Sequence, residues 1–293
     1  MNSDNKAALS ALEWYVDNGV TDVLEEAPVD KTKAVAKSAP PKTENSQSAP
    51  SVAQTLPEAE KSAPAQVQKS ANVMGTPEAI KKATELAKAA TTLDELREAI
   101  AAFDGLSVKK TAQNLVFSDG NPQAKIMVIG EAPGADEDEQ GKPFVGSSGQ
   151  LLDKILGSIG LSRTAENPND ALYISNILNW RPPGNRTPTP AEMAIALPFI
   201  ERHIQLVSPR ILILVGNTPM KSLLDTKEGI VKMRGKWHDY ETVTDIGGAP
   251  EQSVIALPTF HPAYLLRNPK KKKTVWQDMI FLQKKRVELG LAS

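Results

Sequence analysis

The chain has 293 residues, and its 34 Lys and Arg residues are almost balanced by 35 Asp and Glu residues. No global positive field therefore draws it to nucleic acid, so any such binding must depend on local basic clusters. The absence of cysteine excludes disulfides, thiolate nucleophiles and Cys-ligated metals. With no secretory signal pattern and no apolar run of about 18 residues, a cytoplasmic location is expected.

Residues 1–75 are expected to contribute little to the folded core. Residues 1–27 include a short helical pattern, ALSALEWYVDNGVTDVLEE, which predicts either a partner-binding helix or a marginal one that docks weakly on the main domain. Residues 28–75 are rich in Ala, Pro, Ser and Lys without any aromatic residue, so they predict a disordered linker. Residues 76–104 predict a helical lead-in, with Thr76 and Thr92 where helix caps belong.

The folded core is predicted to span residues 105–293. Strand and helix patterns alternate along it, and this alternation predicts a mainly parallel sheet covered on both faces. The stretch 230–245 predicts a small hairpin or loop before the last strand. The expected strands are Ile126–Ile129, Leu172–Leu178, Ile211–Val215 and Val254–Phe260, and the expected helices are Ser148–Ile159, Pro190–Val207, Asn217–Leu224 and Val275–Leu289.

One stretch, KIMVIGEAPGADEDEQGKPFVG at residues 125–146, has the pattern of a binding site. A short apolar run ending at Gly130 predicts a strand buried on both faces. Glu131 then lies at the carboxyl end of that strand, where open α/β sheets bind ligands. Phe144 follows in the same loop, so a carboxylate and an aromatic ring share one strand end. The alternative is an ordinary glycine-rich turn with Phe144 in the core.

Polar residues also follow other predicted strands. Asn176 lies in the second strand and His261 directly follows the fourth. Because the carboxyl ends of parallel strands meet at one rim, Glu131, Phe144, Asn176 and His261 are expected to share a site. A ring can stack on a planar heterocycle, an amide can read its edge, and an imidazole can hydrogen-bond a carbonyl that gains negative charge. Structural roles for the amide and the imidazole are the alternative; His203, in a helical pattern, is expected at the surface.

Basic residues cluster around the same rim. Such groups can hold phosphates, although a run of four lysines is often only a solvated loop. Tyr264, Leu265 and Leu266 lie among them, and apolar side chains beside basic ones can enter a base stack. The basic residues are Arg181, Arg186, Lys232, Arg234, Lys236, Arg267 and Lys270 to Lys273.

The motifs GEAPG, GKPFVG, ISNILNWRPPGNRTP, RGKW and FHPAYLLRNP occur in this order, and together they closely resemble the family 4 uracil-DNA glycosylases. The resemblance covers about residues 105–293. It implies a three-layer α/β/α fold with a central, mainly parallel four-stranded sheet. It also implies an enzyme of base excision repair that flips uracil out of DNA and hydrolyses its N-glycosidic bond, without a metal ion.

By motif position, the resemblance implies a role for each candidate residue. Phe144 would stack on uracil, Asn176 would read its edge, and His261 would stabilise the leaving uracil anion. Glu131 would lie near the reacting sugar and its water. The substrate-binding set also includes Gly130 and Ala132, and the DNA-binding set is Arg181, Arg186, Arg234, Lys236, Leu265 and Arg267.

The chain departs from the family at one point. Family 4 enzymes typically hold a four-iron, four-sulfur cluster on four cysteines, whereas this chain has none. The corresponding positions are Phe103, Leu106, Trp180 and Ala196, which are all apolar. A thiolate-held cluster cannot form there, so no cofactor is expected. Hydrophobic packing is expected to tie the same loops together instead.

The expected function is therefore that of a monomeric, cluster-free uracil-DNA glycosylase acting on uracil-containing DNA. The first alternative is a DNA-binding relative with weak or no activity. The second is a nucleotide-binding α/β protein, which is disfavoured because the chain has neither a GxGxxG nor a GxxxxGK[ST] motif.

Overall fold

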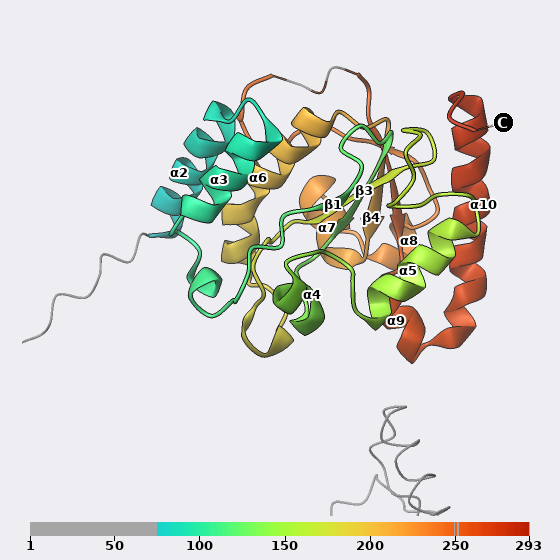
Figure 1. Ribbon diagram of the computed structural model, residues 1–293, viewed down its shortest axis with the longest axis horizontal. Helices are drawn as coiled ribbons and strands as arrows, with labels where there is room; N and C mark the ends of the chain where they lie inside the picture. The colour runs from blue at the N-terminus through green and yellow to red at the C-terminus, as the bar shows by residue number, and fades with distance from the viewer. Residues whose placement is uncertain (1–74, 249, 251, 293) are drawn as a thin grey trace, which may run out of the picture. The chain divides into compact units, whose positions relative to one another are not determined.

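The computed structural model describes residues 75–248, 250 and 252–292, and the predictions for residues 1–74 lie outside this part. The described residues form one six-stranded sheet in the order β1-β3-β2-β4-β6-β5 (Figure 1). The four central strands are parallel, and the two-residue edge strands β1 and β5 are antiparallel to their neighbours. The strands are β1 (Asp119–Gly120), β2 (Ile126–Gly130), β3 (Leu172–Asn176), β4 (Ile211–Val215), β5 (His238–Asp239) and β6 (Ile255–Thr259).

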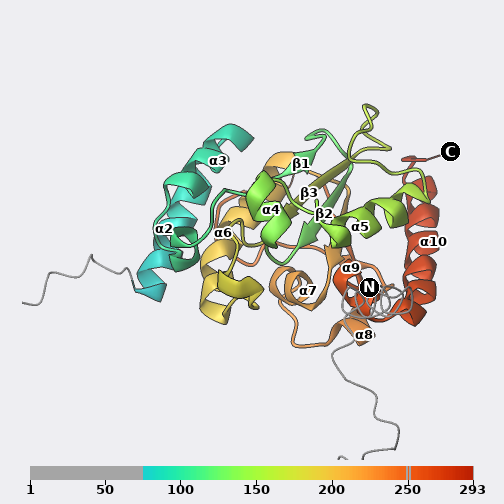
Figure 2. The ribbon, with the colours of Figure 1, turned by 60° about the horizontal axis from the view of Figure 1, so that its bottom comes forward.

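Helices cover both faces of the sheet, with α2, α3, α6 and α7 on one face and α5, α9 and α10 on the other (Figures 1 and 2). The predicted three-layer α/β/α fold with a parallel central sheet is confirmed. None of the helices in the described ranges is long and apolar enough to cross a membrane. The helices are α2 (Thr76–Ala89), α3 (Leu93–Ala102), α4 (Ala135–Gln140), α5 (Ser147–Gly157), α6 (Pro190–Val207), α7 (Asn217–Leu223), α8 (Ile230–Met233), α9 (Pro262–Arg267) and α10 (Lys272–Glu288).

The pleat of the central strands divides the core into two clusters. In β2, Ile126 and Val128 pack with α5 and α10, whereas Met127 and Ile129 pack with α6 on the opposite face. Successive side chains of a strand point to opposite faces, so a strand covered on both sides must be apolar throughout. Each large apolar side chain buried in this way contributes about 1.5–3 kcal/mol to folding.

The lead-in helices begin as the sequence predicts, with one difference. Thr92 caps α3, because its hydroxyl accepts a hydrogen bond from the backbone N–H of Glu95 at 3.2 Å. Helix α2 instead has Gly75 as its N-cap residue, and Thr76 is its first helical residue. Both helices pack on α6, with Ala79, Ala83 and Ala87 fully buried in the contact.

Helix α6 is enclosed, and the predicted surface position of His203 is wrong. The sheet packs on one side of α6 while α2 and α3 pack on the other, so His203 is only 1% exposed. Its ring stacks on Phe117 with a centroid distance of 4.4 Å, and its Nε2 lies 2.8 Å from the Tyr173 hydroxyl. Burial lowers the pKa of His203 to about 3.

Candidate active site

The strand order creates a switch point between β2 and β4, which are neighbours in the sheet. The chain leaves β2 through α4 and α5 on one face to reach β3, and it returns from β3 through α6 on the other face to β4. Open α/β sheets bind ligands in the crevice at such a point, beyond the carboxyl ends of the strands. A cavity of about 620 Å³ lies there, and its lining includes Glu131 after β2 and Asn217 after β4.

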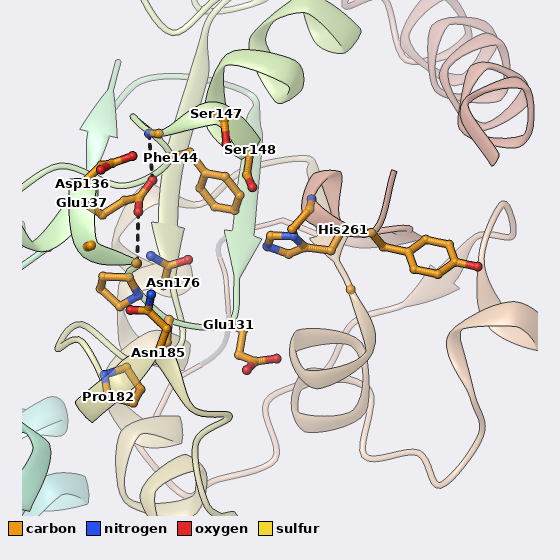
Figure 3. Close-up of a pocket in the computed structure, with 18 of the residues that line it drawn as sticks. Glu131, Asp136, Glu137, Phe144, Ser147, Ser148, Asn176, Pro182, Asn185 and His261 are labelled. Atoms are coloured by element: carbon orange, nitrogen blue, oxygen red, sulfur yellow. Dashed lines mark hydrogen bonds between the residues drawn. The ribbon is translucent and has the colours of Figure 1, made fainter. Parts of the chain in front are cut away.

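The cavity brings together the four residues that the strand ends were expected to supply. Glu131, Phe144, Asn176 and His261 all line it (Figure 3). Asn176 and Phe144 are buried, and Gly130 allows both to approach the end of β2. A Cβ on Gly130 would lie 2.3 Å from the Asn176 Oδ1 and 2.6 Å from the Phe144 Cζ. Glycine is therefore required for the amide and the ring to occupy these positions.

Phe144 has a left-handed backbone conformation, with φ at 54°. Two contacts hold it there. Gly149 lets α5 approach closely, since a Cβ on it would lie 1.9 Å from the Phe144 carbonyl oxygen. The guanidinium of Arg163, 12% exposed, donates from Nη2 to the Phe144 carbonyl at 2.8 Å and from Nη1 to the Pro143 carbonyl at 3.0 Å. The backbone that carries the ring is thus fixed from both sides.

His261 is the N-cap residue of α9, and its hydrogen bonding defines its tautomer. Its Nδ1 accepts a hydrogen bond from the Ala263 N–H at 3.1 Å, which leaves Nε2 to carry the proton. Burial, with a further contribution from Arg267, lowers the pKa of His261 to about 4. The ring lies 5.7 Å from the Phe144 ring, centroid to centroid. The imidazole is therefore neutral near pH 7, with an N–H free to donate.

Glu131 is held in the cavity wall by a residue that the sequence reasoning missed. The Thr218 hydroxyl donates to Glu131 Oε2 at 2.5 Å. Thr218 belongs to the first turn of α7, directly after the carboxyl end of β4. The strand-end rule that selected Glu131 also covers this position, so the signal for Thr218 was present in the sequence.

A second missed residue, Glu137 in α4, ties the two halves of the site loop together. Its Oε1 accepts from the backbone N–H groups of Val145 and Gly146, both at 3.0 Å, and its Oε2 accepts from that of Gly134 at 3.0 Å. Figure 3 shows the bonds to Gly146 and Gly134. These bonds connect the GEAPG segment with the KPFVG segment. The position of Glu137 three residues after Gly134 is typical of a capping carboxylate.

Other cavity residues come from segments that the sequence analysis left without a role. Ser147 and Ser148 begin α5, where unpaired backbone N–H groups favour an anion. Asn185 also lines the cavity, with a left-handed φ of 54°, and its Oδ1 accepts from Arg181 Nε at 2.7 Å. The cavity therefore offers a stacking ring, an amide, a neutral imidazole, a carboxylate and an anion-favouring helix start.

The sequence profile of the Uracil DNA glycosylase superfamily matches residues 117–280, which include every one of these groups. The chain belongs to this superfamily. It is 32% identical over 192 residues to the Type-4 uracil-DNA glycosylase of Sulfurisphaera tokodaii, covering 64% of this chain and 81% of that protein. It is 38% identical over 156 residues to the Type-4 uracil-DNA glycosylase of Thermotoga maritima, covering 53% of this chain and 73% of that protein. It is 35% identical over 191 residues to the Type-4 uracil-DNA glycosylase of Saccharolobus solfataricus, covering 64% of this chain and 82% of that protein.

Only some of the predicted DNA-binding residues of the chain lie at the cavity. Arg186 and Arg267 line it, as does Ala132 of the predicted substrate-binding set. Arg186 also forms a two-pronged ion pair with Glu192, at 2.8 and 2.6 Å, which lowers the pKa of that carboxyl to about 2. Arg181 and Lys236 lie outside the lining, and Lys236 is exposed.

The structure places two of the predicted DNA-binding side chains largely inside the fold. Residues 262–267 form helix α9, and successive positions on a helix point about 100° apart. Leu265 is therefore fully buried in the core, whereas Leu266 is 44% exposed. Arg234 is mostly enclosed: its guanidinium pairs with Asp278 and lies 5.5 Å from the centroid of the Phe260 ring. Its charge is thus engaged within the fold.

The four positions that the resemblance matches to the family's cluster cysteines belong to one hydrophobic cluster. Phe103, Leu106, Trp180 and Ala196 are 4%, 4%, 7% and 2% exposed, and all belong to the core cluster that surrounds α6. Phe103 packs edge-on against Phe199, with ring centroids 5.3 Å apart. These side chains supply no metal ligand, so they fit apolar packing and do not fit an iron–sulfur cluster.

The lowered pKa values of His203 and His261 predict a stability that depends on pH. The pKa is about 3 for His203 and about 4 for His261, against about 6.5 in an unfolded chain. Between about pH 4 and 6.5 the unfolded chain binds more protons, so the free energy of unfolding falls as the pH is lowered. The expected slope is about 1.4 kcal/mol per pH unit for each histidine.

The variant His203→Gln removes one of the two histidines, so the slope should be smaller than that of the wild type by about 1.4 kcal/mol per pH unit. Urea denaturation at several pH values between 4.5 and 6.5 measures it, with His238→Gln as the matched control. Burial raises the pKa values of Glu201 and Asp278, so these carboxyls contribute to the slope with the opposite sign. Their contribution is the same in the wild type and the variant, and it cancels when the two slopes are subtracted. Equal slopes for the wild type and His203→Gln would contradict the prediction.

Proposed function

We propose that the chain is a uracil-DNA glycosylase that excises uracil from DNA by base flipping and hydrolysis of the N-glycosidic bond. One observation carries this proposal: a single cavity combines the Phe144 ring, the Asn176 amide and a neutral His261 imidazole with its Nε2–H free. The membership of the superfamily and the printed names of its relatives support the same activity. We further propose a monomer in the cytoplasm, acting as part of base excision repair.

Phe144 and Asn176 are proposed to recognise the flipped base. A pyrimidine stacked on the Phe144 ring would present its edge to Asn176, whose amide offers both a donor and an acceptor. Both side chains are fixed by burial, so little conformational entropy is lost when the base binds. Gly130 contributes because a Cβ at this position would collide with both side chains.

His261 is proposed to stabilise the departing uracil anion. As the glycosidic bond breaks, negative charge develops on the O2 of uracil, and the Nε2–H of His261 donates to it. The imidazole does this as a neutral donor, because its pKa is about 4. A fixed donor aimed at developing charge is typically worth about 10²–10³ in rate.

Glu131 is proposed to act on the other side of the bond. Its carboxylate, oriented by Thr218, can stabilise positive charge on the sugar and hold the attacking water. The start of α5 with Ser147 and Ser148, together with Arg267, is proposed to hold flanking phosphates. Leu266, which is exposed beside Arg267, takes the role of the apolar side chain that enters the base stack.

A DNA-binding relative without activity is the second candidate, because the chain lacks the family's cysteines. Release of free base from oligonucleotides with one uracil, set against matched oligonucleotides with cytosine or thymine, separates the two. Uracil should be released from single- and double-stranded substrates, and the controls should stay intact. Tight binding of the uracil substrate with no free uracil would favour the inactive relative.

Arg163 is expected to act through Phe144. Lysine at this position keeps the charge but lacks the planar fork that contacts two carbonyls and the carboxylates of Asp119 and Asp153 at once. Arg163→Lys should therefore lower kcat/KM for excision by about tenfold, because the stacking ring is less well positioned. In a double-mutant cycle with Phe144→Leu, the loss of activity should be non-additive while the loss of melting temperature adds. Additive losses of activity would show that Arg163 acts independently of the ring.

A further inference from the structure

A groove between α5 and α10 lies apart from the candidate active site and combines an exposed aromatic ring with basic side chains. Its volume is about 400 Å³. Trp276 is 48% exposed at its edge. Among the described residues, none of its three lysines forms an ion pair. The groove is lined by Ile155, Val275 and Trp276 together with Lys154, Lys272 and Lys273.

We propose that this groove binds the single-stranded flank of the DNA substrate, with a base stacked on Trp276 and the backbone phosphates held by the lysines. The inference rests on the proposed function and extends its binding site. Proteins that hold single strands without regard to sequence combine a positive groove with aromatic rings, since every base has a face that can stack. The groove between α5 and α10 has both features.

A short stretch of chain connects the active-site cavity to the groove. Arg267 lines the cavity at the end of α9, and Lys272 lines the groove at the start of α10. Between them Lys270 and Lys271 are exposed, so positive charges extend from one site to the other. Five residues span at most about 18 Å, which corresponds to about five stacked nucleotides. A strand whose uracil enters the cavity is thus within reach of the groove.

The charges favour nucleic acid over a protein partner. Every ionisable side chain that lines the groove is basic, and the nearby Asp153 and Asp278 are both engaged by arginines. A protein that docked on the apolar face of α10 would also contact Ile280 and Val287, which are exposed but lie outside the groove lining. This difference gives the test a matched control on the same helix.

The test uses single-stranded oligonucleotides in which the flank on either side of uracil is extended from two to ten nucleotides. For the wild type, KM should fall as one flank reaches about five nucleotides. Trp276→Ala should lose that gain, with KM about fivefold or more above the wild type on long substrates and unchanged kcat. Ile280→Ala should match the wild type. Changing Lys154, Lys272 and Lys273 to Gln should reduce the salt slope of binding by up to about two.

The outcomes separate this inference from the proposed function. If Trp276→Ala has the same KM as the wild type at each flank length and still releases uracil, the groove proposal is wrong and the proposed activity stands. An equal rise in KM for Ile280→Ala would also overturn it, in favour of a general apolar surface. If no variant releases uracil, anisotropy with uracil-free single strands decides, since the groove still requires weaker binding by Trp276→Ala.

Discussion

Replacing His261 with alanine is expected to slow uracil excision by about 10²–10³-fold while the domain remains folded. The Nε2–H of His261 is the donor placed to receive charge from the leaving base, and its tautomer is set by the Ala263 N–H. The side chain contributes a cap to a six-residue helix, so its loss should have a small effect on melting. Single-turnover kinetics on a uracil oligonucleotide measure the effect.

Asn176→Ala should produce a loss of the same order by a different route. The amide lies at the end of β3 beside Gly130, where it is proposed to read the base edge. Excision should fall, and any remaining activity should discriminate less between uracil and cytosine. Thr226→Ala, in the half-buried loop after α7 and outside the cavity lining, is the control. Near wild-type rates for both His261→Ala and Asn176→Ala, with normal melting temperatures, would contradict the roles proposed for these two residues.

Trp180→Ala should give the largest loss of stability. The ring is 7% exposed in the cluster that occupies the positions of the family's cysteines, and Lys109 Nζ lies 5.9 Å from its centroid. Removing a buried tryptophan side chain typically costs about 3–5 kcal/mol. For a domain of this size the melting temperature should fall by roughly 6–20 °C.

Calorimetry of Trp180→Ala measures this effect, and Trp276→Ala is the matched control because its ring is half exposed. The variant should still release uracil below its melting temperature, since Trp180 does not itself line the cavity. An unchanged melting temperature would show that the cluster around Trp180 does not tie these loops together. The absence of an iron–sulfur cluster would still follow from the absence of cysteine.

The sheet was predictable from the sequence because buried parallel strands leave a simple pattern. Ile211–Val215 is apolar throughout, and its predicted bounds are those observed. The short helices α4 and α9 were missed, because six residues are too few to establish a helical period. That omission had a consequence: without α9, nothing in the sequence distinguished the buried Leu265 from the exposed Leu266.

The candidate site was predictable where a residue lies at or just after the end of a strand, as Glu131, Asn176 and His261 do. It was not predictable where a role depends on partners distant in the chain. Arg163 contacts the Phe144 carbonyl from 19 positions away. Arg234 is engaged by Asp278 at a separation of 44 positions, so a basic residue expected at DNA lies in an internal ion pair.

The most direct test of the central claim measures iron content and uracil release on one preparation of the full chain. The proposal predicts a folded protein without stoichiometric iron that releases free uracil from a uracil oligonucleotide in a single turnover, with His261→Ala slower by about 10²–10³-fold. A folded, iron-free protein that binds the same oligonucleotide yet releases no uracil would contradict it.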